Sequence, residues 1–190
     1  MNKFFLLSSL LIASFGAKAQ SSFYTLIQGG ANIGFANEGY TGAFSGYSAS
    51  FVFGKNYNDR AYLGLGVGTE QLKGNYQTND PYHAKVGEIA RYDRQLFPIF
   101  VDGRLPFGEF NANSKIGMFA NAGYAPSIAA KYDKGFLFKG GFFYLHENPS
   151  NIDWTVSAAY GYQELAGNRI DIGKKFQHQQ FNISVGILLK

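Results

Sequence analysis

The amino-acid sequence predicts an all-β fold, specifically an eight-stranded antiparallel up-and-down transmembrane β-barrel. After residue 20, apolar residues alternate with small or polar residues eight times, each time over the length of a strand. Only 16% of the residues are charged, against roughly 25% in a typical soluble domain. The 190 residues also include 19 Phe and 13 Tyr, and aromatic residues gather near the ends of the apolar faces. Much of the surface is therefore expected to face something other than water.

The N-terminal segment, residues 1–19, is typical of a secretory signal peptide. Lys3 supplies the positive charge, an apolar stretch follows over 4–15, and residues 17–19 read Ala-Lys-Ala, the small-x-small form of a cleavage site. The apolar stretch is shorter than the roughly 20 residues that a spanning helix needs. No cysteine follows that could carry a lipid. We expect export, cleavage, and one mature domain over residues 20–190.

The first three strands are expected over 22–36, 43–54 and 61–71. Their apolar face is formed by alternate residues, and Gly, Ser, Asn and Gln predominate between them. The larger apolar residues of this face are Phe23, Ile27, Ile33, Phe35, Tyr47, Phe51, Phe53, Leu63, Leu65 and Val67. A tight polar turn is expected around 56–59. The segment from about 73 to 91 is long and polar, so it is expected to be a loop.

The fourth strand is expected over 94–107, with apolar residues on one face and Asp102 and Arg104 on the other. Pro98 interrupts it. Proline has no N–H group to donate to a neighbouring strand, so a bulge or a local break is expected at this position.

The last four strands are expected over 115–125, 136–146, 152–163 and 179–189. Alternation is poorest in the second of these, because Leu137 and Phe143 make both faces apolar. The third is among the cleanest, because Trp154, Val156 and neighbouring apolar residues oppose polar ones. The alternate connections at 55–60, 108–114 and 147–151 are shorter than those at 72–93, 126–135 and 164–178, an asymmetry typical of membrane barrels.

The small and polar face suits the crowded interior of a narrow barrel, and the apolar, aromatic face suits lipid. The alternative is a soluble, lipocalin-like periplasmic barrel with its apolar face inside. Such a protein would expose Gly-rich and Ser-rich faces with few charges to water. The sequence therefore favours the membrane interpretation.

Three segments give the chain a resemblance to a known group: Gly64-Leu65-Gly66-Val67-Gly68, the segment from Pro98 to Arg104, and the strand from Phe181 to Leu189. It resembles the small outer-membrane barrels of the OmpX/OmpA type, particularly those of Bacteroidetes. The resemblance extends over nearly the whole mature chain as a pattern. Barrels of this kind usually end on an aromatic residue that the assembly machinery reads, whereas this chain ends Leu188-Leu189-Lys190.

Seven charged residues share the inward-facing parity: Glu70, Arg94, Asp102, Arg104, Lys115, Lys139 and Asp153. Isolated buried charges are costly, so these side chains are expected to pair. Strand directions place Glu70 and Arg94 toward the outer end, and Asp102, Arg104, Lys115 and Asp153 toward the periplasmic end. Because eight strands leave an interior just wide enough for side chains, we expect two ionic clusters that plug the barrel. A gated ion path is the alternative.

No catalytic, cofactor-binding or metal-binding residue is predicted. Gly64, Gly66 and Gly68 lack the lysine and hydroxyl residue of a phosphate loop, and the three histidines fall at opposite ends of the expected barrel. A lipid-modifying enzyme would need a Ser–His pair near the outer rim, for which His83 and His178 are the candidates. The chain has no cysteine nucleophile.

The expected role is structural, or surface interaction through the external loops, which hold Tyr76, Tyr82, Tyr92 and Tyr132. The alternatives are a small-solute or ion pore and, less favoured, the lipid-modifying enzyme. The expected partners are outer-membrane lipid and lipopolysaccharide, the barrel assembly machinery and an extracellular ligand, with the protein a monomer. Nucleic acid is not an expected partner, because without residues 1–19 the net charge is +2, from 15 Lys and Arg against 13 Asp and Glu.

Overall fold

The computed structural model describes residues 21–37, 40–78, 89–150, 152–166 and 176–190. The predicted signal peptide and the mature start at Gln20 lie outside these residues. The strands are β1 (Ser21–Asn37), β2 (Tyr40–Thr41), β3 (Ser45–Tyr57), β4 (Tyr62–Thr78), β5 (Ala90–Leu96), β6 (Ile99–Asn111), β7 (Ser114–Ala125), β8 (Gly135–His146), β9 (Ile152–Leu165) and β10 (Phe176–Leu189).

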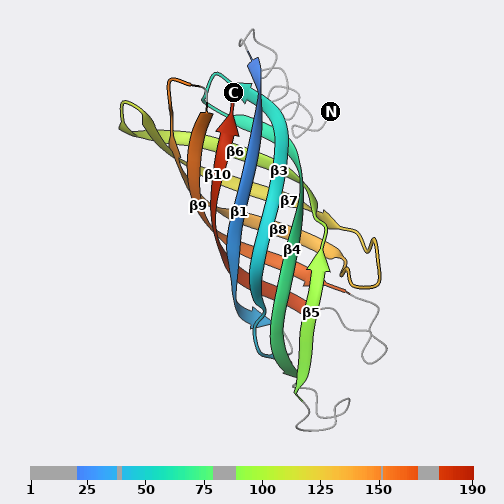
Figure 1. The fold of residues 1–190 in the computed structure, drawn as a ribbon. Helices are drawn as coiled ribbons and strands as arrows, with labels where there is room; N and C mark the ends of the chain where they lie inside the picture. The colour runs from blue at the N-terminus through green and yellow to red at the C-terminus, as the bar shows by residue number, and fades with distance from the viewer. Residues whose placement is uncertain (1–20, 38–39, 79–88, 151, 167–175) are drawn as a thin grey trace, which may run out of the picture.

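The strands form a closed antiparallel ring (Figure 1). Around the ring, β1 pairs with β3, β3 with β4, β4 with β5 and β6, and so on to β10. The ring closes because β10 pairs with β1, from Thr25 opposite Leu189 to Asn37 opposite His178. Since β5 and β6 share one position and β2 is a short addition beside the end of β1, the ring has 8 positions. The predicted eight-stranded up-and-down barrel is confirmed.

The expected interruption at Pro98 is present as a local break. The expected fourth strand is divided into β5 and β6, which pair with the same strand, β4. Glu70 lies opposite Leu96 and Val67 opposite Ile99, so two residues separate these pairs on each strand and the register does not change. The Gly68 amide still donates to the Pro98 carbonyl at 2.9 Å. Proline has no N–H group that could donate the return bond to Gly68.

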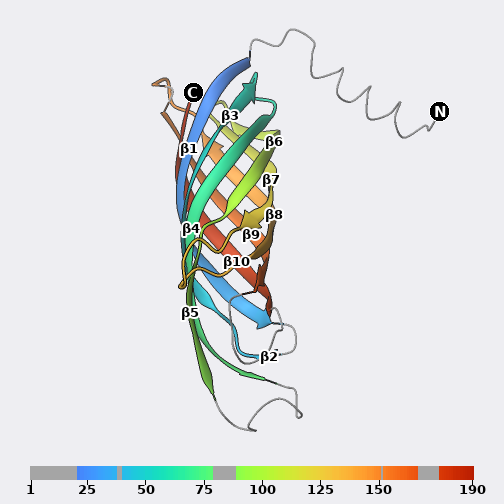
Figure 2. The same cartoon turned by 90° about the vertical axis from the view of Figure 1, so that its right-hand side faces the viewer.

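The prediction of a loop from about 73 to 91 is wrong at both ends. β4 continues to Thr78, β5 begins at Ala90, and Lys73 lies opposite Asp93. The polarity of the two faces changes along this hairpin: Leu72 and Tyr92 are buried inside, whereas Lys73 and Asp93 are exposed outside. The hairpin here faces water, so its polar outer face resembled a loop. The β4–β5 end of the barrel lies opposite the end where β10 stops (Figures 1 and 2).

The outer surface carries a belt of exposed apolar side chains contributed by every long strand. Leu65 is 69% exposed, Val185 63% and Phe142 65%. The belt also includes Phe23, Phe51, Val101, Met118, Phe136, Ile152 and Ile183. Soluble proteins rarely expose apolar patches above a few hundred Å². The predicted assignment of the apolar face to the outside is therefore confirmed, and this belt is the lipid-facing surface of a transmembrane barrel.

The interior is filled by side chains. Toward the end where β10 stops, the apolar fillers include Tyr24, Leu26, Tyr62 and Leu188. Glycines make room for large neighbours: a Cβ atom on Gly66 would lie 2.4 Å from the ring of Phe100. The cavity that remains in the middle of the lumen has a volume of about 20 Å³, about enough for one water molecule. Among the described residues, no helix is long and apolar enough to cross a membrane.

Candidate functional site

The barrel interior holds a buried ion pair on one strand. Asp102 and Arg104 are two residues apart on β6, so both side chains point inward, and they are 0% and 1% exposed. The Arg104 Nε donates to the Asp102 carboxylate at 3.0 Å, and its Nη2 donates to the Gln28 Oε1 at 2.9 Å. The Tyr24 hydroxyl donates to Asp102 at 3.3 Å. With its amide nitrogen turned toward Asp102, the Asn121 side chain donates to Asp102 Oδ1 at 2.9 Å.

Two aromatic rings complete the surroundings of Arg104. Its guanidinium carbon lies 5.0 Å from the ring centroid of Phe119 and 5.6 Å from that of Phe143. Both distances are within the range of cation–π attraction. The guanidinium and the carboxylate thus have partners on several strands, which offsets the cost of removing them from water.

A second ion pair crosses the lumen. Lys139 on β8 donates to Glu70 on β4, and both side chains are almost entirely buried. Because β6 and β7 lie between these two strands in the ring, the pair bridges the interior rather than neighbouring strands. Glu70, Lys139, Asn121 and Phe100 line the small central cavity. This contact blocks the lumen at its middle.

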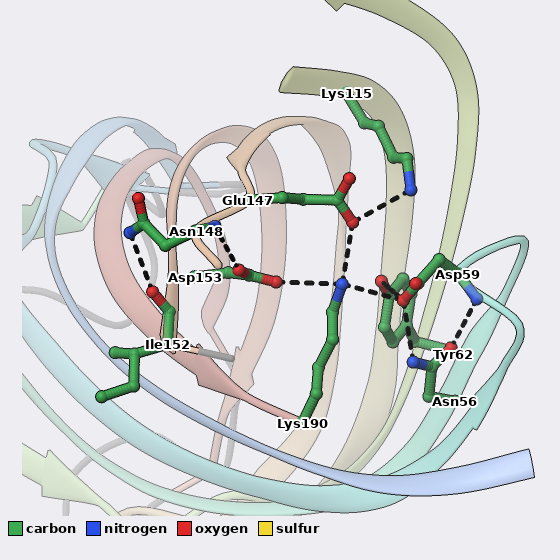
Figure 3. A network of polar contacts seen from close by, with 9 residues as sticks. All are labelled: Asn56, Asp59, Tyr62, Lys115, Glu147, Asn148, Ile152, Asp153 and Lys190. Atoms are coloured by element: carbon green, nitrogen blue, oxygen red, sulfur yellow. Dashed lines mark hydrogen bonds and ion pairs between the residues drawn. The ribbon is translucent and has the colours of Figure 1, made fainter. Parts of the chain in front are cut away.

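A charge cluster lies at the end where β10 stops, centred on Lys190 (Figure 3). The Lys190 Nζ lies 2.9 Å from Asp59, 2.8 Å from Glu147 and 2.9 Å from Asp153. Glu147 also accepts from Lys115 at 2.9 Å. The cluster, which we call the rim cluster, joins the β3–β4 turn, the β8–β9 connection, β7, β9 and the residue after β10. It therefore closes this end of the lumen.

Hydrogen bonds orient the carboxylates of the rim cluster. Asp59 accepts from Tyr62 at 2.7 Å and from the Asn56 amide at 2.8 Å, while its own backbone N–H donates to Asn56. The predicted tight turn here is confirmed, with Asn58 and Asp59 in the left-handed region at φ of 54° and 56°. Asn and Asp tolerate that conformation better than other side chains.

The electrostatics of the rim cluster follow from these contacts. Burial alone would raise the pKa of Asp59, but hydrogen bonds from Lys190, Tyr62 and Asn56 outweigh it and lower the pKa from 3.8 to about 2. Burial would likewise raise the pKa of Glu147, and its bonds to Lys190 and Lys115 lower it instead. For Lys190, burial opposes the charged form, yet three carboxylates raise its pKa above the usual value.

The seven predicted lumen charges do not form the two predicted clusters. Glu70 pairs with Lys139 rather than with Arg94, whose Nη1 donates to the Ala130 carbonyl at 2.6 Å in the β7–β8 connection. Asp102 and Arg104 pair with each other. Lys115 and Asp153 instead belong to the rim cluster. The alternation along each strand correctly predicted that these residues point inward. It does not contain the tilt of the strands, which decides which inward-facing residues lie at the same height in the barrel.

Three members of the rim cluster were missed by sequence reasoning. Lys190 shares the inward parity of Leu188, so extending the β10 alternation by one step would have included it. Asp59 and Glu147 lie in turns, where alternation ends and gives no direction. Their position depends on the turn conformation alone.

The other end of the lumen is closed by an apolar plug. Phe44, Tyr92 and Phe176 are buried there, with the rings of Phe44 and Tyr92 stacked at 4.1 Å. Leu72, Leu96, Ala125 and Leu165 belong to the same plug, and Tyr76 packs against it. Tyr92 is therefore an interior residue rather than an exposed loop residue, which corrects that expectation. Tyr82 lies outside the described residues.

The β7–β8 connection, residues 126–134, packs against β5 at the same end of the barrel as the plug. The Tyr92 hydroxyl donates to Asp133 at 2.6 Å, the Gln95 amide donates to the Lys131 carbonyl at 3.1 Å, and the Asp133 amide donates to the Gln95 carbonyl at 2.9 Å. Ile128, by contrast, is 56% exposed. This end thus presents an ordered polar surface with a few apolar side chains.

The histidines offer limited chemistry. His178 is buried beside Phe44 in the plug, His146 lies at the opposite end, and His83 is outside the described residues. The Ser114 hydroxyl lies 3.1 Å from the Nδ1 of His146 and 2.8 Å from the Tyr144 hydroxyl, but no described acidic side chain forms an ion pair with His146. Within the described part of the chain, no group of three potential metal-ligating residues occurs.

Arg104→Met tests the buried ion pair. The substitution leaves the Asp102 carboxylate buried without its cation, so the free energy of unfolding in detergent micelles should fall by about 3–5 kcal/mol. The control is Lys73→Met, because the Lys73–Asp93 pair is 3.8 Å apart and half exposed, and should cost no more than about 1 kcal/mol. Equal, small losses in urea titrations of both variants would contradict this assignment.

The rim cluster should make stability depend on pH. The lowered pKa of Asp59 gives a contribution that is present above the unfolded value of 3.8 and is lost as pH falls through about 2. The raised pKa of Lys190 gives one that is present below 10.5 and lost as pH rises through its folded value. Lys190→Gln should remove roughly 1–3 kcal/mol at neutral pH and flatten both limbs. Lys55→Gln, at an exposed position, is the control. Urea midpoints of Lys190→Gln that equal those of the wild-type protein at every pH would refute the network.

No protein-family model matches the chain, and no curated protein matches it. Its fold is similar to the crystal structure of Neisserial surface protein A (NspA), with a TM-score of 0.55, 14% sequence identity, and coverage of 90% of this chain and 98% of that chain. An identity this low shows a shared fold alone. The comparison therefore supports the predicted barrel architecture, while membership of the OmpX/OmpA group stays an expectation.

Proposed function

We propose that this protein is an exported, non-enzymatic outer-membrane β-barrel of a Gram-negative cell, with a closed lumen, that acts at the cell surface through its β4–β5 end. The observation that carries the proposal is the change of polarity along the barrel. Around the belt the outer face is apolar and the lumen holds buried charged and polar side chains among its apolar fillers, whereas beyond the belt the outer face is polar and the lumen is filled by the apolar plug. Such a molecule fits a membrane with one end projecting into water.

The connections support this orientation. The end where β1 begins and β10 stops has the short connections at 58–61 and 112–113. The longer connections, at 79–89 and 166–175, join strands at the opposite end. Short periplasmic and long external connections are the usual arrangement in outer-membrane barrels. NspA, which shares the fold, is named as a surface protein. The proposed location for this chain agrees with that name.

The surface role is supported by the external end itself. Arg91, Asp93 and Lys73 are exposed on the β4–β5 hairpin, and Ile128 is exposed on the ordered β7–β8 connection. A polar surface with a few exposed apolar side chains, fixed on packed strands, suits contact with another surface.

The pore alternative is disfavoured by three successive obstructions. The aromatic plug, the Glu70–Lys139 bridge and the rim cluster each close the lumen, and the central cavity holds about 20 Å³. A hydrated ion needs a continuous path that these contacts interrupt.

Surface exposure can be measured by labelling single cysteines in intact cells, because the natural chain has none. Ala129→Cys, at the proposed outer end, should react with a membrane-impermeant maleimide. Asn113→Cys, in the β6–β7 turn, is the matched exposed control and should react only after the outer membrane is permeabilised. Labelling of Asn113→Cys alone in intact cells would reverse the proposed orientation.

Conductance in planar lipid bilayers tests the closed lumen. The purified protein should give no steady unitary current, because the ion pairs and the plug leave no continuous water path. A steady current that changes in size with Lys139→Gln would instead establish a pore through the lumen.

A further inference from the structure

The lipid-facing surface contains an apolar groove near the β10-stop end. It has a volume of about 620 Å³ and crosses β4, β6, β7 and β8. Its floor is a row of directly paired small residues, Gly103, Ala120 and Gly140, and Leu105, Met118 and Phe142 form one wall. The groove walls project outward, so an occupant would lie against the outside of the barrel.

A polar notch of about 550 Å³ adjoins this groove. It exists because β4 begins at Tyr62, opposite Arg104, whereas β6 continues to Asn111 without a β4 partner. Neighbouring residues of the same segments line both spaces: Arg60 lines the notch and Ala61 the groove, while Pro106 lines the notch and Leu105 the groove. The two spaces therefore lie side by side on the same segments.

The charges of the notch are of both signs. Arg60 and Glu109 are exposed, and neither forms an ion pair with a described residue. The other two charged groups are already engaged, Lys115 with Glu147 and Asp59 with Lys190. One free cation and one free anion complement a headgroup that carries a phosphate and an ammonium.

From this geometry we infer a binding site for a zwitterionic phospholipid, with one acyl chain in the groove and the headgroup in the notch. The Arg60 guanidinium binds the phosphate and the Glu109 carboxylate binds the ammonium. The apolar lining of the groove favours an occupant that carries an acyl chain, and the Glu109 carboxylate disfavours an anionic headgroup. The inference rests on the membrane-spanning part of the proposed function and adds a specific lipid partner to it.

Native mass spectrometry of the detergent-purified barrel, titrated with phosphatidylethanolamine, tests the site. Wild-type protein should bind one phosphatidylethanolamine molecule and should retain it more tightly than it retains phosphatidylglycerol. Ala120→Leu fills the groove and Arg60→Gln removes the phosphate contact, and each should weaken retention about tenfold, the loss of one charge-assisted or well-packed contact. Ala122→Leu, two residues along the same outward face, and Arg91→Gln, on β5, are the matched controls and should retain the lipid.

Circular dichroism checks that each variant is folded before its lipid adducts are compared. If Ala120→Leu does not fold, Arg60→Gln still tests the site, because Arg60 lies in an exposed turn. Equal retention in Arg60→Gln and Arg91→Gln would overturn the site. Tighter binding of phosphatidylglycerol or of lipid A would overturn the zwitterionic assignment. If Ala129→Cys is labelled on intact cells and the lipid is not retained, only this inference fails; if the protein is not in the membrane, the proposed function fails with it.

Discussion

Closure of the strand ring is the constraint on which the rest of the structure depends. In lipid no water can satisfy free N–H and C=O groups, so an open sheet edge would cost several kcal/mol per group. The pairing of β1 with β10 removes both edges at once. Closure with so few strands then fixes a narrow interior, and that interior must be filled by the side chains that face it. The ion pairs, the inward-facing Gly66 that makes room for Phe100, and the aromatic plug are all consequences of this narrowness.

Polarity follows from the same geometry. The outer face must match its surroundings, which are apolar around the belt and aqueous beyond it, while the inner face needs compact contacts at every height. Charged pairs such as Asp102–Arg104 are placed where the outer wall is in lipid, and Phe44, Tyr92 and Phe176 are packed where the outer wall is in water. The barrel thus combines the inside-out arrangement of a membrane protein with the ordinary arrangement of a soluble one along a single set of strands.

Alternation with a period of two was sufficient to predict most of the fold. It placed Leu63, Leu65 and Val67 outside and Asp102 and Arg104 inside, because parity is a property of each strand alone. It failed at 73–78 and 90–93, where the same parity continued but the chemistry of the two faces was exchanged. It also failed to pair Glu70 with Lys139 or to find Asp59 and Glu147, since contacts across the lumen depend on strand tilt and turn conformation. The groove beside Gly103 and Ala120 arises because these two small residues lie opposite each other on neighbouring strands. The alternation within one strand does not predict such a pairing.

The mobility of the unboiled protein in a detergent gel, taken from isolated outer-membrane fractions, tests the closed transmembrane barrel most directly. A closed barrel with its ring of hydrogen bonds intact stays compact in the detergent and should migrate faster than the boiled, unfolded chain. A single mobility before and after boiling, with the protein recovered in the soluble periplasmic fraction, would contradict the account and would mean that the apolar belt does not face lipid.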